Sequence, residues 1–159
     1  MARAIFPAPD HDHDRCARAA IAHAEKQCAV REQRLTPIRR QVLETLLASH
    51  QPLGAYEIID RLPAESRPAP ITIYRALDFL RDNGLVHRIA SRNAFVACVH
   101  DHAGDDLVVF LICEGCGAVG EAPGGHVADA LKVSSRAAGF SPKSPIIEIP
   151  GICSHCRQR

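Results

Sequence analysis

The sequence has no tryptophan, one methionine, two tyrosines and five phenylalanines in 159 residues. A small core with so few aromatic side chains benefits from an added cross-link such as a bound metal. No stretch reaches the ~18 consecutive apolar residues of a membrane-spanning helix. Residues 1–14 carry prolines and aspartates where a signal peptide would be apolar. We therefore expect a cytoplasmic protein with reduced thiols and no membrane partner, in which cysteines favour metal binding over disulfides.

The sequence also lacks a strong net charge, which is only +1. Total charge therefore gives no indication of nucleic-acid binding. The distribution is more informative, because residues 31–40 hold four arginines against one acid, Glu32. The N-terminal half is the more basic part of the chain.

Four of the seven cysteines form two Cys-x-x-Cys pairs, Cys113 with Cys116 and Cys153 with Cys156. Each pair presents two sulfurs on one tight turn, and together they supply the four thiolates of a tetrahedral zinc site. The pattern predicts a structural metal that ties the end of the chain to its middle. Redox Cys-x-x-Cys motifs usually occur singly, at a helix start. An iron–sulfur cluster, which also takes four thiolates, is the other alternative.

Residues 12–99 carry helix signals followed by a hairpin signal. Thr36 and Pro37 indicate a helix start, because threonine caps a helix and proline fits its first turn. Thr72 is expected to cap a later helix that Asn83-Gly84 ends. Alternation around Ser91-Arg92-Asn93 predicts a β-hairpin. Helices are predicted over residues 13–31, from 37 to before Pro52, 55–62 and 73–83, and strands over 85–90 and 94–99. Helices followed by a two-stranded hairpin are typical of a winged helix-turn-helix.

The pattern changes after residue 100. Residues 100–106 are polar and predict a hinge. Strands are predicted over residues 107–112, 118–121 and 145–149, with a helix over 123–138 between the last two. The chain is therefore predicted to be α+β, with an N-terminal winged helix-turn-helix DNA-binding domain and a small C-terminal α/β domain. The predicted boundaries are a disordered N-terminus at 1–11, the winged helix at 12–99, the hinge at 100–106 and the metal-stapled domain at 107–159.

A winged helix places one helix in the DNA major groove, and the helix predicted over 73–83 is in the position to do so. Arg75 is the best base-reading candidate, because its guanidinium fork matches the O6 and N7 atoms of guanine. Tyr56 could contact a thymine methyl group or a phosphate. The alternative is an ordinary solvated helix face. The candidate DNA contacts are Arg75, Tyr74, Thr72, Tyr56, Arg39, Thr36 and Arg34.

A second metal site is suggested by His87 and Cys98 on the two hairpin strands and by Glu121 at a later strand end. One nitrogen, one thiolate and one or two further donors suit tetrahedral Zn²⁺. Candidates for the fourth ligand are His100, His102 and Asp106. The alternative is that Cys98 is a packed small hydrophobe and His87 a surface residue.

Several motifs along the chain form a recognisable set. They are residues 24–29 (AEKQCA), 34–39 (RLTPIR), 72–80 (TIYRALDFL), 84–87 (GLVH), 93–98 (NAFVAC) and 110–121 (FLICEGCGAVGE). These motifs resemble the ferric uptake regulator (Fur) family, and within it the zinc uptake regulators. The similarity spans about residues 22–156.

The resemblance implies a homodimeric repressor with a C-terminal dimerisation domain and a structural zinc on the four cysteines. It also implies a regulatory zinc at the hinge, on His87, Cys98 and Glu121. The family's remaining ligand is a histidine where this chain has Asp106, and His102 lies four residues earlier. Iron sensors of the family usually have glutamate at the position of Cys98, and thiolate favours zinc on grounds of softness.

We therefore expect a zinc-responsive transcriptional repressor of zinc uptake and homeostasis genes, whose occupied hinge site favours binding of the dimer to palindromic double-stranded DNA. An iron or peroxide sensor of the same family, and a zinc-stapled protein-interaction module without DNA, are the alternatives. A zinc enzyme with a small-molecule substrate is disfavoured. The sequence has no His-Glu-x-x-His or deaminase motif, and a closed four-cysteine site cannot activate water.

Overall fold

The computed structural model describes residues 5–6, 12–48, 51–98, 107–143 and 145–158. The chain divides into two compact units. The N-terminal unit is Pro9–Asp101, and the C-terminal unit is His102–Arg159 together with Met1–Ala8. Among the described residues, no helix combines the length and the apolar character needed to cross a membrane.

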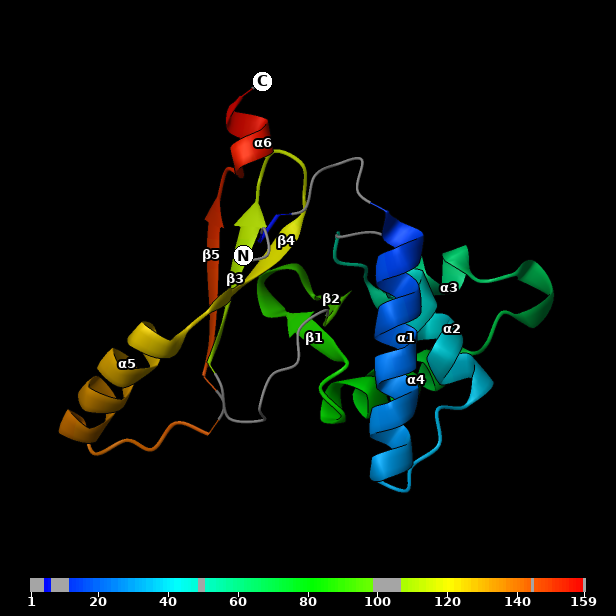
Figure 1. The fold of residues 1–159 in the computed structure, drawn as a ribbon, viewed down its shortest axis with the longest axis horizontal. Coiled ribbons are helices and arrows are strands. Elements are labelled where there is room, and N and C mark those ends of the chain that lie inside the picture. Colours follow the sequence, from blue (N-terminus) through cyan, green and yellow to red (C-terminus); the bar gives the residue numbers. More distant parts are fainter. Residues whose placement is uncertain (1–4, 7–11, 49–50, 99–106, 144, 159) are drawn as a thin grey trace. The chain divides into compact units, whose positions relative to one another are not determined.

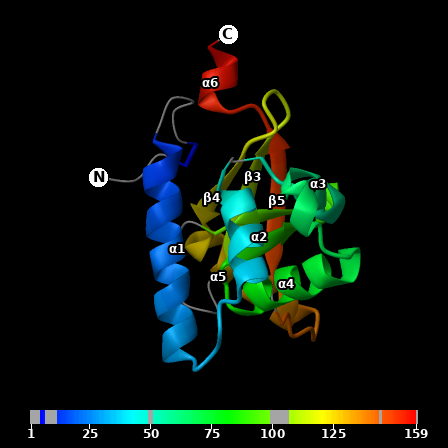
Figure 2. The same cartoon turned by 90° about the vertical axis from the view of Figure 1, so that its right-hand side faces the viewer.

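The N-terminal unit is a set of helices followed by a two-stranded antiparallel hairpin (Figure 1). Its elements are α1 (His13–Val30), α2 (Pro37–Leu47), α3 (Ala55–Arg61), a 3-10 turn (Ala64–Ser66), α4 (Pro70–Asp82), β1 (Val86–Ile89), a second 3-10 turn (Ala90–Arg92) and β2 (Ala94–Ala97). Figure 1 and Figure 2 both show α1 and α4 beside α2. This order confirms the predicted helices and hairpin, with strands shorter than expected.

Helix starts follow the local sequence. At α1 the Asp12 carboxylate accepts a hydrogen bond from the Arg15 backbone N–H at 2.9 Å, which satisfies one otherwise unpaired helix donor. At α2 the predicted N-cap Thr36 and first-turn Pro37 are confirmed, although Thr36 caps without a side-chain hydrogen bond. The helix ends at Leu47, before the predicted stop at Pro52.

The start of α4 differs from the prediction. The helix begins at Pro70 with Ala69 as its N-cap, so Thr72 lies inside the first turn and does not cap it. The reason is Pro70 itself, because its fixed φ and missing N–H suit the first helical position. The expected end is confirmed, since Gly84 adopts a left-handed φ of 69° just after the helix.

The core of the N-terminal unit lies where the apolar stripes of its helices meet. Fully buried residues are Ala24, Val42, Ile58, Ile73 and Leu80. Each large aliphatic side chain so buried contributes about 1.5–3 kcal/mol. The hairpin joins this core through Leu53 and Phe95, whose backbones exchange hydrogen bonds of 2.9 and 2.8 Å. Asn93 closes the hairpin in a left-handed conformation, with φ 47°.

The C-terminal unit is built on a three-stranded sheet in the order β4-β3-β5. Its elements are β3 (Val108–Cys113), β4 (Val119–Pro123), α5 (Gly125–Ala137), β5 (Ile146–Gly151) and α6 (Ser154–Arg157). β4 pairs antiparallel with β3, whereas β5 pairs parallel with it, and α5 lies in the crossover (Figure 1). Central β3 is the buried strand, as predicted, while α5 and β5 expose much of their apolar surface.

Candidate metal centre and nucleic-acid interface

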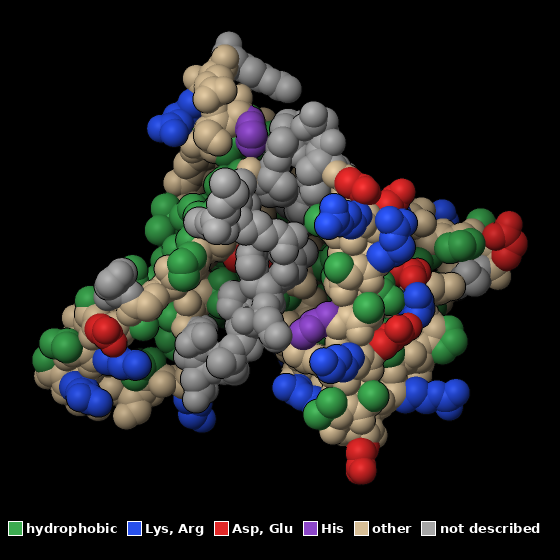
Figure 3. Space-filling model, viewed as in Figure 1, with side chains coloured by type: hydrophobic (Ala, Val, Ile, Leu, Met, Phe, Trp, Pro, Cys, Tyr) green, Lys and Arg blue, Asp and Glu red, His purple; other side chains and the backbone are tan. Residues whose placement is uncertain are grey.

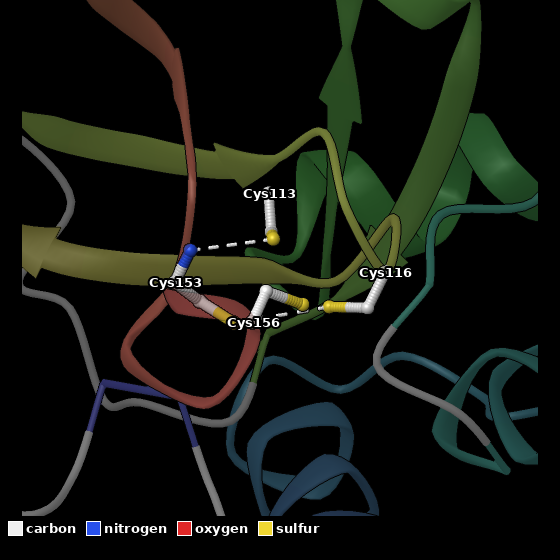
Figure 4. A group of neighbouring side chains, drawn as sticks. All are labelled: Cys113, Cys116, Cys153 and Cys156. Carbon is white, nitrogen blue, oxygen red and sulfur yellow. Dashed lines mark hydrogen bonds between the residues drawn. The ribbon is translucent and has the colours of Figure 1, made fainter. Parts of the chain in front are cut away.

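The two Cys-x-x-Cys pairs meet at one end of the C-terminal sheet (Figure 4). Cys113 ends β3, and Cys116 lies in the turn that leads to β4. Cys153 is the N-cap of α6, and Cys156 lies within that helix. The parallel register sets Cys113 opposite Gly151. The chain that follows β5 therefore places the second cysteine pair at the same end of the sheet as the first. These four residues form the four-cysteine centre.

The distances in the four-cysteine centre suit a tetrahedral metal. The four sulfur atoms all lie within 4.8 Å of one another, and the Cys116 and Cys153 sulfurs are 3.9 Å apart. Zinc bound tetrahedrally at ~2.3 Å per sulfur needs sulfur pairs about 3.8 Å apart. Four thiols of this spacing therefore fit one zinc ion without a large rearrangement.

The thiols of Cys113 and Cys156 in this centre have different pKa values. The backbone N–H of Cys153 donates to the Cys113 sulfur at 3.3 Å, and this hydrogen bond, followed by one from the Cys116 N–H, lowers the pKa of Cys113 to about 6. The hydrogen bond with Cys153, followed by burial, raises the pKa of Cys156 to about 12. The backbone around Cys113 thus stabilises the thiolate form that binds metals.

Gly115 also belongs to this centre, although none of the predicted ligand or binding residues includes it. A Cβ atom at this position would lie 3.1 Å from the Cys156 sulfur and 3.2 Å from its Cβ. The missing side chain therefore lets the first turn approach the second pair closely. A glycine between two ligand cysteines is the sequence signal that could have identified it.

His87 and Cys98 are neighbours on the β1–β2 hairpin. His87 pairs with Val96, and the Cys98 backbone N–H continues the ladder by donating to the Leu85 carbonyl at 2.9 Å. This register makes His87 and Cys98 diagonal neighbours on one face, ~7–8 Å apart between Cα atoms, within reach of one shared ion. The sequence had placed them only on two strands.

The other predicted ligands belong to different parts of the chain. Glu121 lies in β4 of the C-terminal unit, opposite Phe110, and is 9% exposed. Keeping a carboxylate away from water costs free energy unless a partner compensates, so its position suits a ligand role. His100, His102 and Asp106 lie outside the described residues.

α4 presents the candidate DNA-reading face. Arg75 and Tyr74 are exposed and Thr72 is half-buried, while Ile73 turns into the core. Tyr56, near the start of α3, is 65% exposed. On the face of the N-terminal unit that Figure 3 shows, lysine and arginine side chains are interspersed with acidic ones. The candidate for reading DNA is the exposed face of α4.

Comparison with known proteins identifies the family. The sequence profile of the ferric uptake regulator family matches residues 31–149. The zinc uptake regulation protein of Escherichia coli (strain K12) is 39% identical over 137 residues, which are 86% of this chain and 80% of that protein. The chain belongs to the ferric uptake regulator family.

Solved structures of the family agree with this assignment. A zinc uptake regulator in complex with zinc and DNA is 36% identical, with a TM-score of 0.82 over 89% of this chain and 95% of that one. Holo XcZur is 39% identical, with a TM-score of 0.80 over 90% and 99%. The likeness confirms the predicted α+β fold class of a winged helix followed by a small dimerisation domain.

In this family member, Arg39 makes contacts inside the N-terminal unit that the sequence did not reveal. Its guanidinium lies 3.5 Å from the centre of the Phe79 ring and donates to the Arg34 carbonyl at 2.7 Å. Arg40 is bound to Glu25 and Glu44. Arg39 therefore links the start of α2 to α4. Of the other two candidate contacts nearby, Arg34 supplies the carbonyl that Arg39 binds and Thr36 is the N-cap of α2.

Proposed function

We propose that this protein is a zinc-responsive, DNA-binding repressor of zinc uptake and homeostasis genes. The observation that carries the proposal is its likeness, over most of both chains, to a zinc uptake regulator solved with zinc and DNA. The E. coli relative, whose name is that of a regulator of zinc uptake, supports the same function. All of these relatives are named as regulators, which favours regulation over catalysis.

The four-cysteine centre is the proposed structural zinc site. Its sulfurs would use all four tetrahedral positions, so no position is left for a reacting water. Its function would be to hold the tail after β5 against the turn after β3. Zinc bound here contributes directly to the folding free energy of the unit.

His87, Cys98 and Glu121 are the proposed ligands of a second, regulatory zinc, with the fourth ligand among His100, His102 and Asp106. An imidazole nitrogen, a thiolate and a carboxylate oxygen form a donor set that zinc accepts readily. The thiolate of Cys98 favours zinc over the harder ferrous ion. This supports zinc sensing over iron or peroxide sensing.

A homodimer through the C-terminal unit is supported by its exposed apolar surface. β5 is an edge strand, and Ile146 and Ile149 on it are exposed. Val133 of α5 is 68% exposed and Phe140 is 64% exposed. Soluble proteins seldom leave an edge strand and an apolar helix face of this kind uncovered. A second copy of the chain would cover both.

The regulatory ligands come from both units, which suggests how zinc and DNA binding are coupled. Two ligands lie on the winged-helix hairpin and one on β4, so a shared ion would favour one arrangement of the hinge. If that arrangement sets the two recognition helices of the dimer ~34 Å apart, both half-sites of a palindrome can be read together. Zinc and DNA would then strengthen each other's binding by ~1–3 kcal/mol.

The decisive experiment measures operator affinity of the purified protein across buffered free zinc while bound zinc is counted. We expect affinity to rise as the count goes from one to two zinc ions per chain. The H87A and C98A variants should keep one zinc and remain in the weak-binding state. C16A, which removes a cysteine of α1 outside both sites, is the matched control. A count that stops at one, or an affinity independent of zinc, would reject the regulatory site.

A further inference from the structure

The N-terminal residues Ile5 and Phe6 lie against β4 of the C-terminal unit. A Cβ atom built on Gly120 would lie 2.6 Å from Ile5 Cγ2, 2.9 Å from the Ile5 carbonyl oxygen and 3.3 Å from Phe6 Cζ. These are the three atoms nearest to that position, so Gly120 leaves the space that residues 5–6 occupy. Any side chain at Gly120 would displace them, because Cβ contacts below about 3 Å meet steep repulsion.

A second contact joins the same segment to the four-cysteine centre. The ring N–H of His155 donates to the Phe6 carbonyl at 3.3 Å. His155 lies in α6, between the ligand candidates Cys153 and Cys156. Residues 5–6 therefore contact two elements of the C-terminal unit, β4 and the helix that supplies half of the metal ligand candidates.

The chain that follows leads into the other unit. Asp12 caps α1 of the N-terminal unit, and only residues 7–11 separate it from Phe6. Six residue steps at ~3.3–3.6 Å each span at most about 22 Å. While Phe6 is docked, the start of α1 cannot move further than this from the docking surface. Residues 99–106 form the other connection between the units.

We propose that Ile5-Phe6 is an intramolecular strap, docked on Gly120 and His155, that provides a second tether between the two units. The tether restricts the arrangements of the hinge when the regulatory site is empty. Because fewer hinge arrangements are available to the zinc-free protein, less conformational entropy is lost when zinc fixes one of them. The strap therefore lowers the free zinc concentration needed for operator binding. This last effect rests on the proposed function, whereas docking of the strap does not.

Docking is tested by trypsin cleavage after Arg3, which requires the residues around Ile5 to leave the surface. We expect G120A to accelerate this cleavage about tenfold, because cleavage follows the population of the undocked segment. G125A is the matched control, since nothing lies within 4 Å of a Cβ at that position. Equal cleavage of wild type, G120A and G125A would overturn the strap.

A second measurement covers the case in which cleavage is slow for another reason. The chain has no tryptophan, so F6W introduces a single emission reporter. In F6W the indole should be shielded from acrylamide, and in F6W/G120A it should be quenched as efficiently as free N-acetyltryptophanamide. Docking is contradicted if the indole of F6W is already fully quenched and if G120A, which keeps Phe6, is cleaved by trypsin no faster than wild type.

The effect on regulation is tested by repeating the zinc titration of operator binding. G120A, and separately deletion of residues 2–6, should raise the free zinc at half-maximal binding about threefold, a loop-entropy effect, without weakening binding at saturating zinc. G120A should add nothing in the deleted background. Equal midpoints despite faster cleavage would reject the regulatory role of the strap. If the operator affinity of the wild type is independent of free zinc, the proposed function is rejected. The cleavage result still decides whether the strap is docked.

Discussion

At the scale of single residues, the two arginines of α4 differ in their surroundings. Arg81 lies 3.1 Å from Asp78 and 3.7 Å from Asp82, so acids of its own helix region neutralise it. Arg75 is exposed on the face that also carries Tyr74. Within the described parts of the chain no ion pair of Arg75 with an acid is found, so its donors remain available for a base edge.

We predict that R75A weakens operator binding by about 1–3 kcal/mol and relaxes specificity at one base position. R81A, a matched exposed arginine of the same helix, should change affinity much less. Fluorescence anisotropy with labelled operator at saturating zinc measures both. Unchanged affinity of R75A would support a protein-interaction module over a DNA-binding protein.

Gly115 leads to a second prediction at this scale. A methyl group here would lie 3.1 Å from the Cys156 sulfur, which is tight enough to push the two ligand turns apart. G115A should therefore release the structural zinc to a chelator faster than wild type. G151A, where nothing lies within 4 Å of the added Cβ, is the control. Identical release from G115A and G151A would show that the turns adjust without loss.

At the scale of elements, the contacts of α4 include a cation–π pair with α2. The Arg39 guanidinium stacks on Phe79 and also binds the Arg34 carbonyl just before α2 begins. These contacts hold α2 against α4, the candidate recognition helix. We therefore expect Arg39 to affect DNA binding through the position of α4, in addition to any phosphate contact.

R39A should lower the free energy of unfolding of the N-terminal unit by about 1 kcal/mol, the usual value of a partly exposed cation–π pair. R39K should retain part of this stabilisation. R34A should lose little stability, because it keeps the backbone carbonyl that Arg39 binds. Urea unfolding of the zinc-loaded protein followed by circular dichroism measures the difference. A loss of DNA affinity in R39A without any loss of stability would instead favour direct phosphate contact.

At the scale of the whole molecule, the proposed dimer depends on the C-terminal unit. Ile149 lies on the exposed edge strand β5, and a glutamate there would place charge inside the proposed interface. I149E should shift the protein from dimer to monomer in sedimentation analysis and abolish tight binding to a palindromic operator. V30E, at a position of α1 that is 77% exposed, should leave the dimer intact. A dimer that survives I149E would place the interface elsewhere.

Much of this molecule follows from local sequence. The spacing of the cysteines predicted a four-thiolate centre because two tight turns present two sulfurs each. Thr36-Pro37 and Gly84 determined one helix start and one helix end through backbone preferences that need no tertiary partner. The motifs around Tyr74-Arg75 and Cys113 indicated the family, which the comparisons confirm.

Only the tertiary structure decided the rest, because it depends on contacts between residues distant in sequence. The start of α4 at Pro70 is an exception, since a local preference of the proline prevailed there over the predicted Thr72 cap. The parallel register of β3 and β5 brings Cys113 opposite Gly151. The stacking of Arg39 on Phe79 and the space that Gly120 leaves for Ile5 have no sequence signature, since packing geometry follows from the folded chain and not from residue spacing.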